Sequence, residues 1–226
     1  MILESHLHNE GVTKVTMPNN VTSIGDEAFS GCTGLTSLTI GSGVTSISYH
    51  AFSDCGRLTS IIVKEGNTTY DSRNNCDAII ETATNTLIVG CKSTVIPSSV
   101  TSIGSYAFEY CSGLTSITIP EGVTSISSYA FRACTNLAVV SIPNSMTNIG
   151  SNAFRECGLT EVYCYAEEVP RTNSSAFNEA PIALATLYVP DGTVDTYKAT
   201  APWSSCGTII SFGGKVCATP TITYAN

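Results

Sequence analysis

The sequence predicts a strand-dominated α/β repeat solenoid, because one pattern recurs at a fixed period and alternates apolar with hydroxyl residues. The 23 residues from Val100 to Gly122 read V-T-S-I-G-S-Y-A-F-E-Y-C-S-G-L-T-S-I-T-I-P-E-G. Further copies begin at Val21, Val44, Val123 and Met146. One such unit cannot enclose a core alone, so the copies are expected to stack and bury a continuous one.

Each copy contains two extended segments and one turn. The segment L-T-S-I-T-I alternates apolar and hydroxyl residues before a proline, which predicts a strand with one buried face. V-T-S-I predicts a second short strand on the opposite side, and A-F-x-x-C a single helical turn. In the copy at Val100 the expected inward residues are Val100, Ile103, Ala107, Phe108, Cys111, Leu114, Ile117 and Ile119.

Altered copies extend the array towards both ends. V-T-K-V-T-M-P places Val12, Val15 and Met17 at the three inward strand positions. The final strand, L-A-T-L-Y-V-P, does the same with Leu184, Leu187 and Val189. The spacing of Val169, Thr172, Ala176 and Phe177 also fits the pattern. We therefore expect about eight strands in register, roughly 35 Å long at ~4.8 Å per strand.

Residues 67–99 form an insertion unit of 33 residues, ten longer than the other copies. Asn67 and Tyr70 stand at its first two inward positions, and its last strand segment places Cys91, Thr94 and Ile96 inward. Between them, A-I-I-E-T-A-T-N-T-L-I-V-G predicts a hairpin that bulges from the stack. Because its inward residues are smaller and more polar, this unit is expected to be the weakest rung.

The solenoid is expected to span residues 1–212, with a cap over about 190–212. D-G-T-V-D-T-Y-K-A-T predicts a short helix that Asp191 caps, and Pro202 and Trp203 are expected to cover the end of the core. Residues 213–226 open with a glycine pair and end as a strand-like run begins. We interpret them as a linker and the start of a following domain.

The composition excludes several classes of function. A net charge of -8 argues against binding nucleic acid or anionic lipid. The sequence has no run of about 20 apolar residues, which is the length that a membrane-spanning helix needs. There is no G-x-S-x-G nucleophile motif and no paired C-x-x-C, so the sequence predicts no catalytic site, metal site or cofactor. We assign no such role to His6, His8 or His50.

Five of the ten cysteines occupy one repeat position: Cys32, Cys55, Cys111, Cys134 and Cys157. That position accepts Ala180 and Ile88 in altered copies, which favours buried free thiols that fill space. Stacked neighbours would also have parallel Cβ directions, whereas a disulfide needs converging ones. Cys76 with Cys91, or Cys206 with Cys217, remain candidates for a disulfide.

The unit V-T-S-I-G-x-x-A-F-x-x-C-x-x-L-T-S-I-T-I-P resembles the BspA-like leucine-rich repeats of bacterial surface proteins. The N-x-x-Y of the insertion unit and the P-W of the end segment extend the resemblance over about residues 12–212. The resemblance implies a curved right-handed leucine-rich-repeat solenoid, a location at the cell surface or outside the cell, and adhesion. It implies no individual binding residue.

Outward strand positions are mostly Thr or Ser, with apolar exceptions at Ile62, Val95 and Val139 and aromatic ones at Tyr163, Tyr165 and Tyr188. Tyrosine combines apolar area with a hydroxyl at low entropic cost, which suits recognition of protein or glycan. The three tyrosines are therefore the candidate ligand-binding residues of a monomeric, non-enzymatic binding or adhesion module. Two alternatives stay open: the cap covers these tyrosines, or the chain is a structural spacer that presents a following domain and has no ligand of its own.

Overall fold

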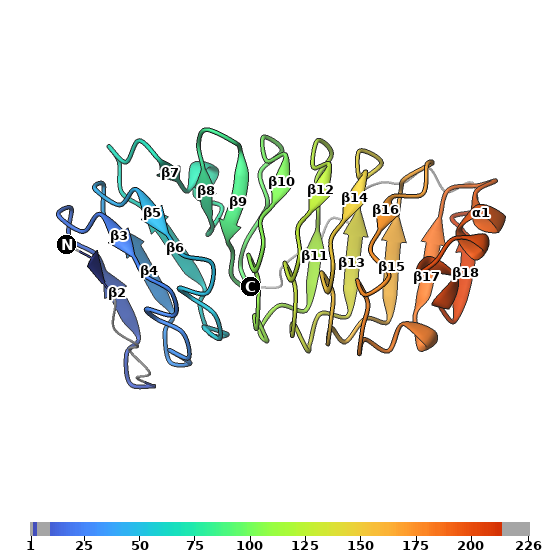
Figure 1. Cartoon of the computed structure of the whole chain (residues 1–226), viewed down its shortest axis with the longest axis horizontal. Coiled ribbons are helices and arrows are strands. Elements are labelled where there is room, and N and C mark those ends of the chain that lie inside the picture. Colours follow the sequence, from blue (N-terminus) through green and yellow to red (C-terminus); the bar gives the residue numbers. More distant parts are fainter. Residues whose placement is uncertain (1, 4–9, 214–226) are drawn as a thin grey trace.

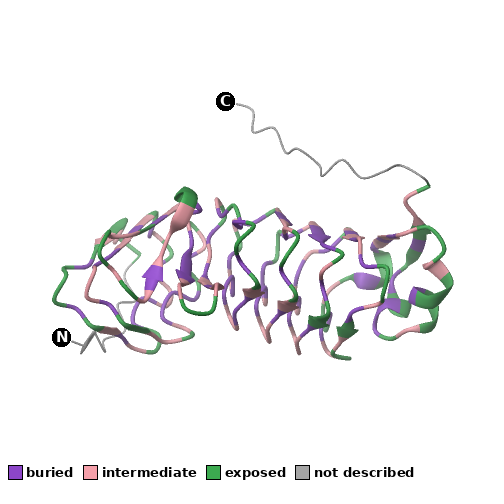
Figure 2. Ribbon diagram, turned by 90° about the horizontal axis from the view of Figure 1, so that it is seen from above, coloured by how far each residue is buried: buried purple, intermediate pink, exposed green. Residues whose placement is uncertain are grey.

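The computed structural model describes residues 2–3 and 10–213 of the chain. Successive turns of the chain stack along one long axis, from the N-terminal strands to the helix α1 (Val194–Ala199) at the other end (Figure 1). Buried and exposed residues alternate along the turns, so that the core lies inside the coil (Figure 2). This is the strand-dominated solenoid that the repeat predicts.

The L-T-S-I-T-I segments form parallel strands on one side. The strands β2 (Lys14–Thr16), β4 (Ser37–Ile40) and β6 (Ser60–Val63) make a three-stranded sheet. A five-stranded sheet consists of β11 (Ser116–Thr118), β13 (Val139–Ile142), β15 (Glu161–Cys164), β17 (Thr186–Val189) and β18 (Thr208–Ser211). β18 is a strand that the sequence pattern did not predict, and it pairs in parallel with β17.

The V-T-S-I segments form the second side. A three-stranded sheet contains β1 (Ile2–Leu3), β3 (Ser23–Ile24) and β5 (Ser46–Ile47). A seven-stranded sheet runs in the order β16 (Arg171–Thr172), β14 (Asn148–Ile149), β12 (Ser125–Ile126), β10 (Ser102–Ile103), β9 (Thr86–Val89), β8 (Ile79–Glu81) and β7 (Tyr70–Asp71). Both sides are thus interrupted at the insertion unit.

The A-F-x-x-C segments are not helical turns, which corrects the prediction. In the copy at Val100, Tyr106 and Tyr110 have positive φ angles of 61° and 57°, which a right-handed helix does not allow. The backbone instead bonds to the next copy: the amide N of Phe108 lies 2.7 Å from the carbonyl O of Ala130. Ala107, Phe108 and Cys111 are buried, as predicted.

Phenylalanine rings stack along the core through this position. Phe108 and Phe131 have ring centroids 4.9 Å apart, and the stack continues to Phe154 and Phe177. Phe29 and Phe52 form a separate stack at 5.4 Å in the N-terminal part. The buried apolar residues accordingly form two clusters, a smaller N-terminal one and a larger C-terminal one.

The insertion unit separates the two clusters and contributes to both. β8 and β9 form the predicted antiparallel hairpin, but β9 also pairs in parallel with β10, so the hairpin lies within the sheet instead of bulging from it. Cys91, Thr94 and Ile96 are buried, as predicted, but residues 91–96 form no strand. The hydroxyl of Thr94 donates to the carbonyl of Asp77 at 2.7 Å and accepts from the amide of Cys91 at 2.8 Å. These local bonds compete with a strand ladder.

A short helix lies at the C-terminal end of the solenoid, with a different residue before it from the one expected. The helix α1 is present and Trp203, in η3 (Trp203–Ser205), is fully buried, but the helix is preceded by Thr193 instead of Asp191. Leu184 was expected inward and is 86% exposed. It ends the short 3₁₀ helix η2 (Ile182–Leu184), and this turn places Ile182 and Ala185 in the core instead. A further 3₁₀ turn, η1 (Arg73–Asn75), lies in the insertion unit.

Candidate binding surface

Two of the three predicted tyrosines form a stacked pair on the five-stranded sheet. Tyr163 in β15 and Tyr188 in β17 are register partners, and alternation along the strands points both side chains away from the core. Their ring centroids are 4.5 Å apart and their planes differ by 4°. Neighbouring strands in register therefore fix this pair on a rigid support.

The third tyrosine, Tyr165, follows β15 and stacks on Phe212, which follows β18, at 4.9 Å. The cap thus covers one face of Tyr165, in part as the alternative interpretation expected. We call Tyr163, Tyr165, Tyr188 and Phe212 the tyrosine surface. Ile210 in β18 is the register partner of Tyr188 and extends the surface with a side chain that is 42% exposed.

An acidic group orders one edge of the tyrosine surface. The hydroxyl of Tyr163 donates a hydrogen bond to Glu161 Oε2 at 2.5 Å. The pKa of Tyr163 is raised well above its ordinary value, first because of this bond and then because of burial, so the phenol stays protonated at neutral pH. The surface therefore presents apolar ring area with a negative charge beside it.

The other apolar outward residues do not join this surface. Ile62 is 50% exposed but lies in the separate three-stranded sheet, and Val95 is 63% exposed within the interrupted segment. Val139 is half-buried in β13, in register with Glu161. The sequence pattern predicted all of these residues at outward positions. It did not show that residues 91–96, which form no strand, divide the outward strand face into two parts.

The nine cysteines among the described residues are buried and form no disulfide bond with one another. Cys76 and Cys91, one of the possible disulfide pairs, belong to different core clusters, and the Cys91 thiol donates to the carbonyl of Asp77 at 3.3 Å. Cys206 forms no disulfide bond among the described residues, while Cys217 lies outside them. Burial raises the pKa of Cys91 to about 11 and that of Cys55 to about 12, so these thiols are protonated and unreactive. The described part of the chain contains no group of His, Cys, Asp and Glu side chains suited to a metal ion.

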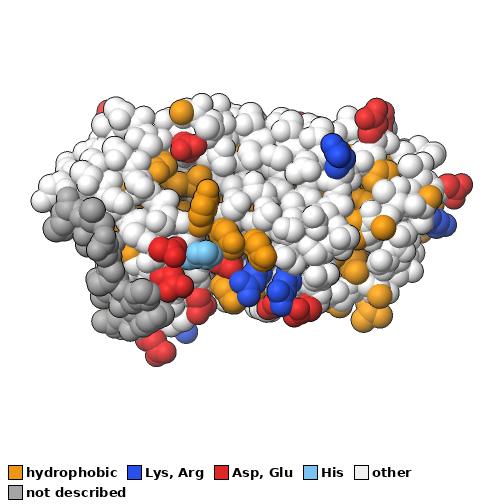
Figure 3. Space-filling model, viewed as in Figure 1, with side chains coloured by type: hydrophobic (Ala, Val, Ile, Leu, Met, Phe, Trp, Pro, Cys, Tyr) orange, Lys and Arg blue, Asp and Glu red, His pale blue; other side chains and the backbone are white. Residues whose placement is uncertain are grey.

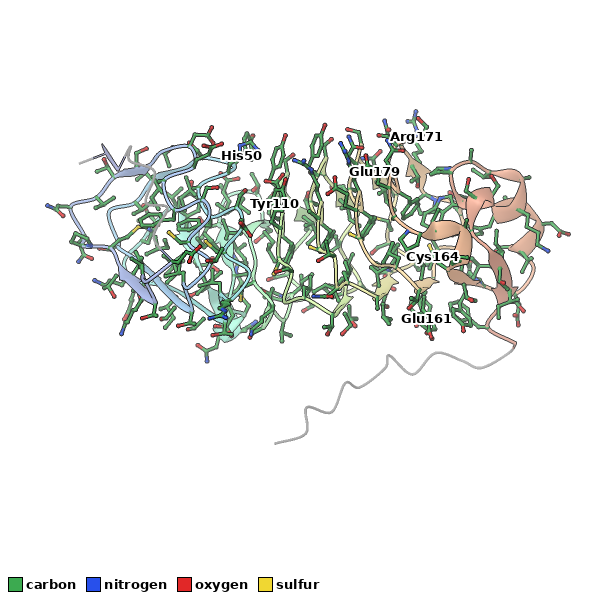
Figure 4. All side chains as sticks on the ribbon, turned by 90° about the horizontal axis from the view of Figure 1, so that it is seen from below. His50, Tyr110, Glu161, Cys164, Arg171 and Glu179 are labelled. Atoms are coloured by element: carbon green, nitrogen blue, oxygen red, sulfur yellow. The ribbon has the colours of Figure 1, made fainter. Side chains whose placement is uncertain are left out.

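A second group of polar and aromatic side chains, which the sequence did not predict, lies along the A-F-x-x-C turns of the solenoid. Figure 3 shows the histidine there beside hydrophobic, acidic and basic side chains, and Figure 4 shows His50 and Glu161 on opposite sides of the solenoid. At its centre is Glu109, whose carboxylate accepts hydrogen bonds from Ser53 Oγ at 2.7 Å and Arg132 Nη1 at 3.0 Å. His50 Nε2 lies 3.9 Å from the same carboxylate.

Aromatic rings continue this group along the turns. Tyr106 stacks on Tyr129 at 5.1 Å, His50 meets Tyr106 edge-on at 4.3 Å, and the Tyr49 ring lies 6.0 Å from that of Tyr106. The only sequence signal was the repeated tyrosine immediately before A-F in two copies, at residues 106 and 129. Contact between Tyr49 and Tyr106 depends on the insertion unit, which brings two distant copies together.

Parallel strands at a 23-residue offset, with a stacked phenylalanine core, define a leucine-rich-repeat type of β-solenoid. The chain belongs to the BspA type leucine rich repeat family, whose model matches in six copies over residues 2–87 and 79–201. Membership of this family confirms the resemblance seen in the sequence. No curated protein matches the chain.

Two solved structures of bacterial proteins share the fold, and a third is also similar to this chain. A leucine-rich repeat protein from Eubacterium ventriosum is 26% identical, with a TM-score of 0.61 over 79% of this chain; the chain spans 48% of that protein. The pneumococcal vaccine antigen PcpA is 16% identical, with a TM-score of 0.53 over 88% of this chain and 68% of its own. A leucine-rich cell surface protein from Faecalibacterium prausnitzii is 21% identical, with a TM-score of 0.47 over 91% of this chain and 61% of its own. Among the described residues, no helix has the length and hydropathy to cross a membrane.

Proposed function

We propose that this chain is a non-enzymatic binding module of a bacterial cell-surface or secreted protein, and that it holds a protein or glycan on the tyrosine surface. The observation that carries the proposal is the stacked pair of Tyr163 and Tyr188 on the outward face of adjacent strands. Most other outward positions on this face are Ser or Thr, which offer little contact area.

The geometry of the pair suits recognition. Both rings are held by register-paired strands, so binding would immobilise few additional torsions. The rings supply apolar area, while the Glu161 carboxylate beside them is an acceptor for a hydroxyl or amide donor. Membership of the BspA-type family supports the location at the cell surface. The module is proposed to act as a monomer.

A spacer role is the second candidate, because Phe212 covers Tyr165 and reduces the open part of the surface. In that role the solenoid would hold a following domain away from the cell, and the tyrosines would only stabilise the C-terminal turns. The two candidates differ in whether the isolated chain binds anything through Tyr163 and Tyr188.

The test compares the wild-type chain with a Tyr163→Ser/Tyr188→Ser variant on an array of glycans and purified extracellular-matrix proteins. The control variant is Ile62→Ser, which removes an exposed apolar side chain from the other sheet. We expect at least one probe to bind the wild type and Ile62→Ser alike, and to bind the double variant about tenfold more weakly or less. Equal binding by the double variant, or no bound probe at all, would favour the spacer.

A further inference from the structure

A hollow of about 370 Å³ lies on the side formed by the V-T-S-I strands, where the insertion unit meets the N-terminal turns. Its walls come from β5 and the residues after it, from β8 and β9 of the hairpin, and from β10 and the residues after β10 and β12. The hollow exists because β5 ends the three-stranded sheet while β9 pairs with β8 and β10, so the two sheets do not join. This volume is within the usual range of small-molecule sites.

An aromatic wall borders the hollow. Tyr49 is 70% exposed and lines it directly, with its ring next to that of Tyr106. Tyr106 is itself fixed between His50 and Tyr129. An exposed ring on such a support offers a flat apolar face, and Figure 3 shows hydrophobic side chains gathered over this part of the molecule.

The remaining lining residues include several that carry hydroxyl groups, one acid and three aliphatic residues, Ile47, Ile88 and Val89. Thr86, Ser102, Ser105 and Ser127 contribute hydroxyl groups, and Glu81 contributes the carboxylate. Glu81 Oε2 accepts a hydrogen bond from the hydroxyl of Thr84, which orients the acid. No Lys or Arg lines the hollow, so an anionic ligand would meet one negative charge and no compensating cation.

We propose that this hollow binds the neutral saccharide end of a glycan. A sugar ring places its C–H face against an aromatic ring and its hydroxyls towards carboxylate and hydroxyl groups. This is the pairing that Tyr49 offers beside Glu81 and the serines. A peptide anchor fits less well, because Glu81 and the hydroxyl groups line the hollow beside the aliphatic Ile47, Ile88 and Val89, and an apolar anchor would leave these polar groups without partners. The site is separate from the tyrosine surface and does not depend on it.

The test uses the full chain and a panel of neutral disaccharides: maltose, cellobiose, lactose and N,N′-diacetylchitobiose. Saturation-transfer NMR identifies the bound sugar and calorimetry measures its affinity. Tyr49→Ala removes an exposed ring, and Glu81→Gln keeps the shape but removes the charge. Ile62→Ser, an exposed position outside both the hollow and the tyrosine surface, is the control, and Tyr188→Ala tests whether the sugar binds at the tyrosine surface instead. We expect Tyr49→Ala and Glu81→Gln each to weaken binding about tenfold or more, and Ile62→Ser to leave it unchanged.

Unfolding midpoints in urea check that each variant is folded. If Tyr49→Ala does not fold, the effect of Glu81→Gln on sugar binding tests the proposal alone. Binding that Tyr188→Ala abolishes would move the sugar to the tyrosine surface and overturn this proposal while supporting the other. Failure of all four sugars, or equal binding by folded Tyr49→Ala and Glu81→Gln, would also overturn it. So would stronger binding of an anionic control such as sialyllactose, or displacement of the sugar by a lysine-containing peptide.

Discussion

At the scale of single residues, Gly90 marks the point where the phenylalanine stack ends against the insertion unit. A Cβ atom built on Gly90 would lie 2.1 Å from Cε1 of Phe108. The amide of Gly90 also donates to the carbonyl of Ala107 at 2.7 Å, so the backbone cannot retreat without losing that bond. The Phe108 ring therefore packs directly against the backbone of Gly90, where no side chain fits.

We predict that Gly90→Ala lowers the free energy of unfolding by about 1–3 kcal/mol, because the added methyl group overpacks the core against Phe108. Urea unfolding followed by circular dichroism measures the loss. Combining Gly90→Ala with Phe108→Leu tests the cause, since a smaller side chain leaves room for the methyl group. A double variant whose loss equals the sum of the single losses would show that the ring is not what excludes the methyl group.

The repeated cysteine has a role that the sequence did not reveal. The thiols of Cys134 and Cys157 donate to the carbonyl oxygens of Phe108 and Phe131 in the preceding copies, each at 3.0 Å. From the sequence, Ala180 at the same position indicated a space-filling residue. Periodicity identifies a buried position, but it cannot show which backbone carbonyl lies within reach of a thiol one turn away.

At the scale of elements, Glu109 ties together three turns across the insertion unit. Its side chain is 2% exposed and bonds to Ser53 in the second full copy and to Arg132 in the copy after its own. Because residues 67–99 contribute no A-F turn, copies that are far apart in sequence become neighbours here. The acid thus joins the N-terminal turns to the C-terminal ones.

We predict that Glu109→Ala destabilises the chain by about 1–3 kcal/mol, because it leaves Arg132 without its partner and opens a cavity. The figure is modest because Arg132 is partly open to water, which screens the pair. Glu109→Gln keeps an acceptor for Ser53 and is expected to cost less. Urea unfolding measures both, and hydrogen exchange should show the amides of residues 44–66 losing protection first. A Glu109→Ala variant as stable as the wild type would show that Glu109 does not hold these turns together.

Regular elements were predictable and irregular ones were not. Alternation of apolar and hydroxyl residues located β4, β11 and the other repeat strands, because each register position recurs in several copies. β18 was missed because its segment has no repeat motif, and its strand forms only by adding to the edge of β17. The left-handed residues of the A-F turns were missed because an apolar pair followed by Cys also fits a helical turn.

At the scale of the whole molecule, the insertion divides one predicted core into two clusters. Ile80 and Leu87 of the hairpin pack into the larger cluster, while Ile79 and Val89 pack into the smaller one. The sequence indicated an irregular rung there. The hollow beside it forms because the three-stranded sheet that ends at β5 does not pair with the seven-stranded sheet that contains β8, β9 and β10. The repeat pattern alone does not show which of these strands pair. The outward direction of Tyr163 and Tyr188 was predictable because strand alternation sets it, whereas Phe212 and Ile210 reach this surface through β18 and the residue after it, which the sequence pattern did not predict.

Buried thiols throughout the solenoid give it a predictable response to alkaline pH. Burial raises the pKa of Cys55 and of Cys206 from the ordinary value of 9.0 to about 12, and that of Cys91 to about 11. In the unfolded chain these thiols lose their protons near their ordinary pKa, while the folded chain keeps them. Their contribution to stability is therefore complete below about pH 9 and is lost as the pH rises towards 11 or 12.

We predict that the urea midpoint, measured with reductant and without oxygen, stays level from pH 7 to about 8.5 and then falls steadily up to pH 10.5. Tyrosines with raised pKa values, such as Tyr70, act in the same direction, so the thiols need a control of their own. A Cys55→Ala/Cys91→Ala variant should lose stability at every pH but show a shallower alkaline decline. A wild-type midpoint that does not change through pH 10.5, or an equal slope in this variant, would mean that burial does not hold these protons in the folded chain.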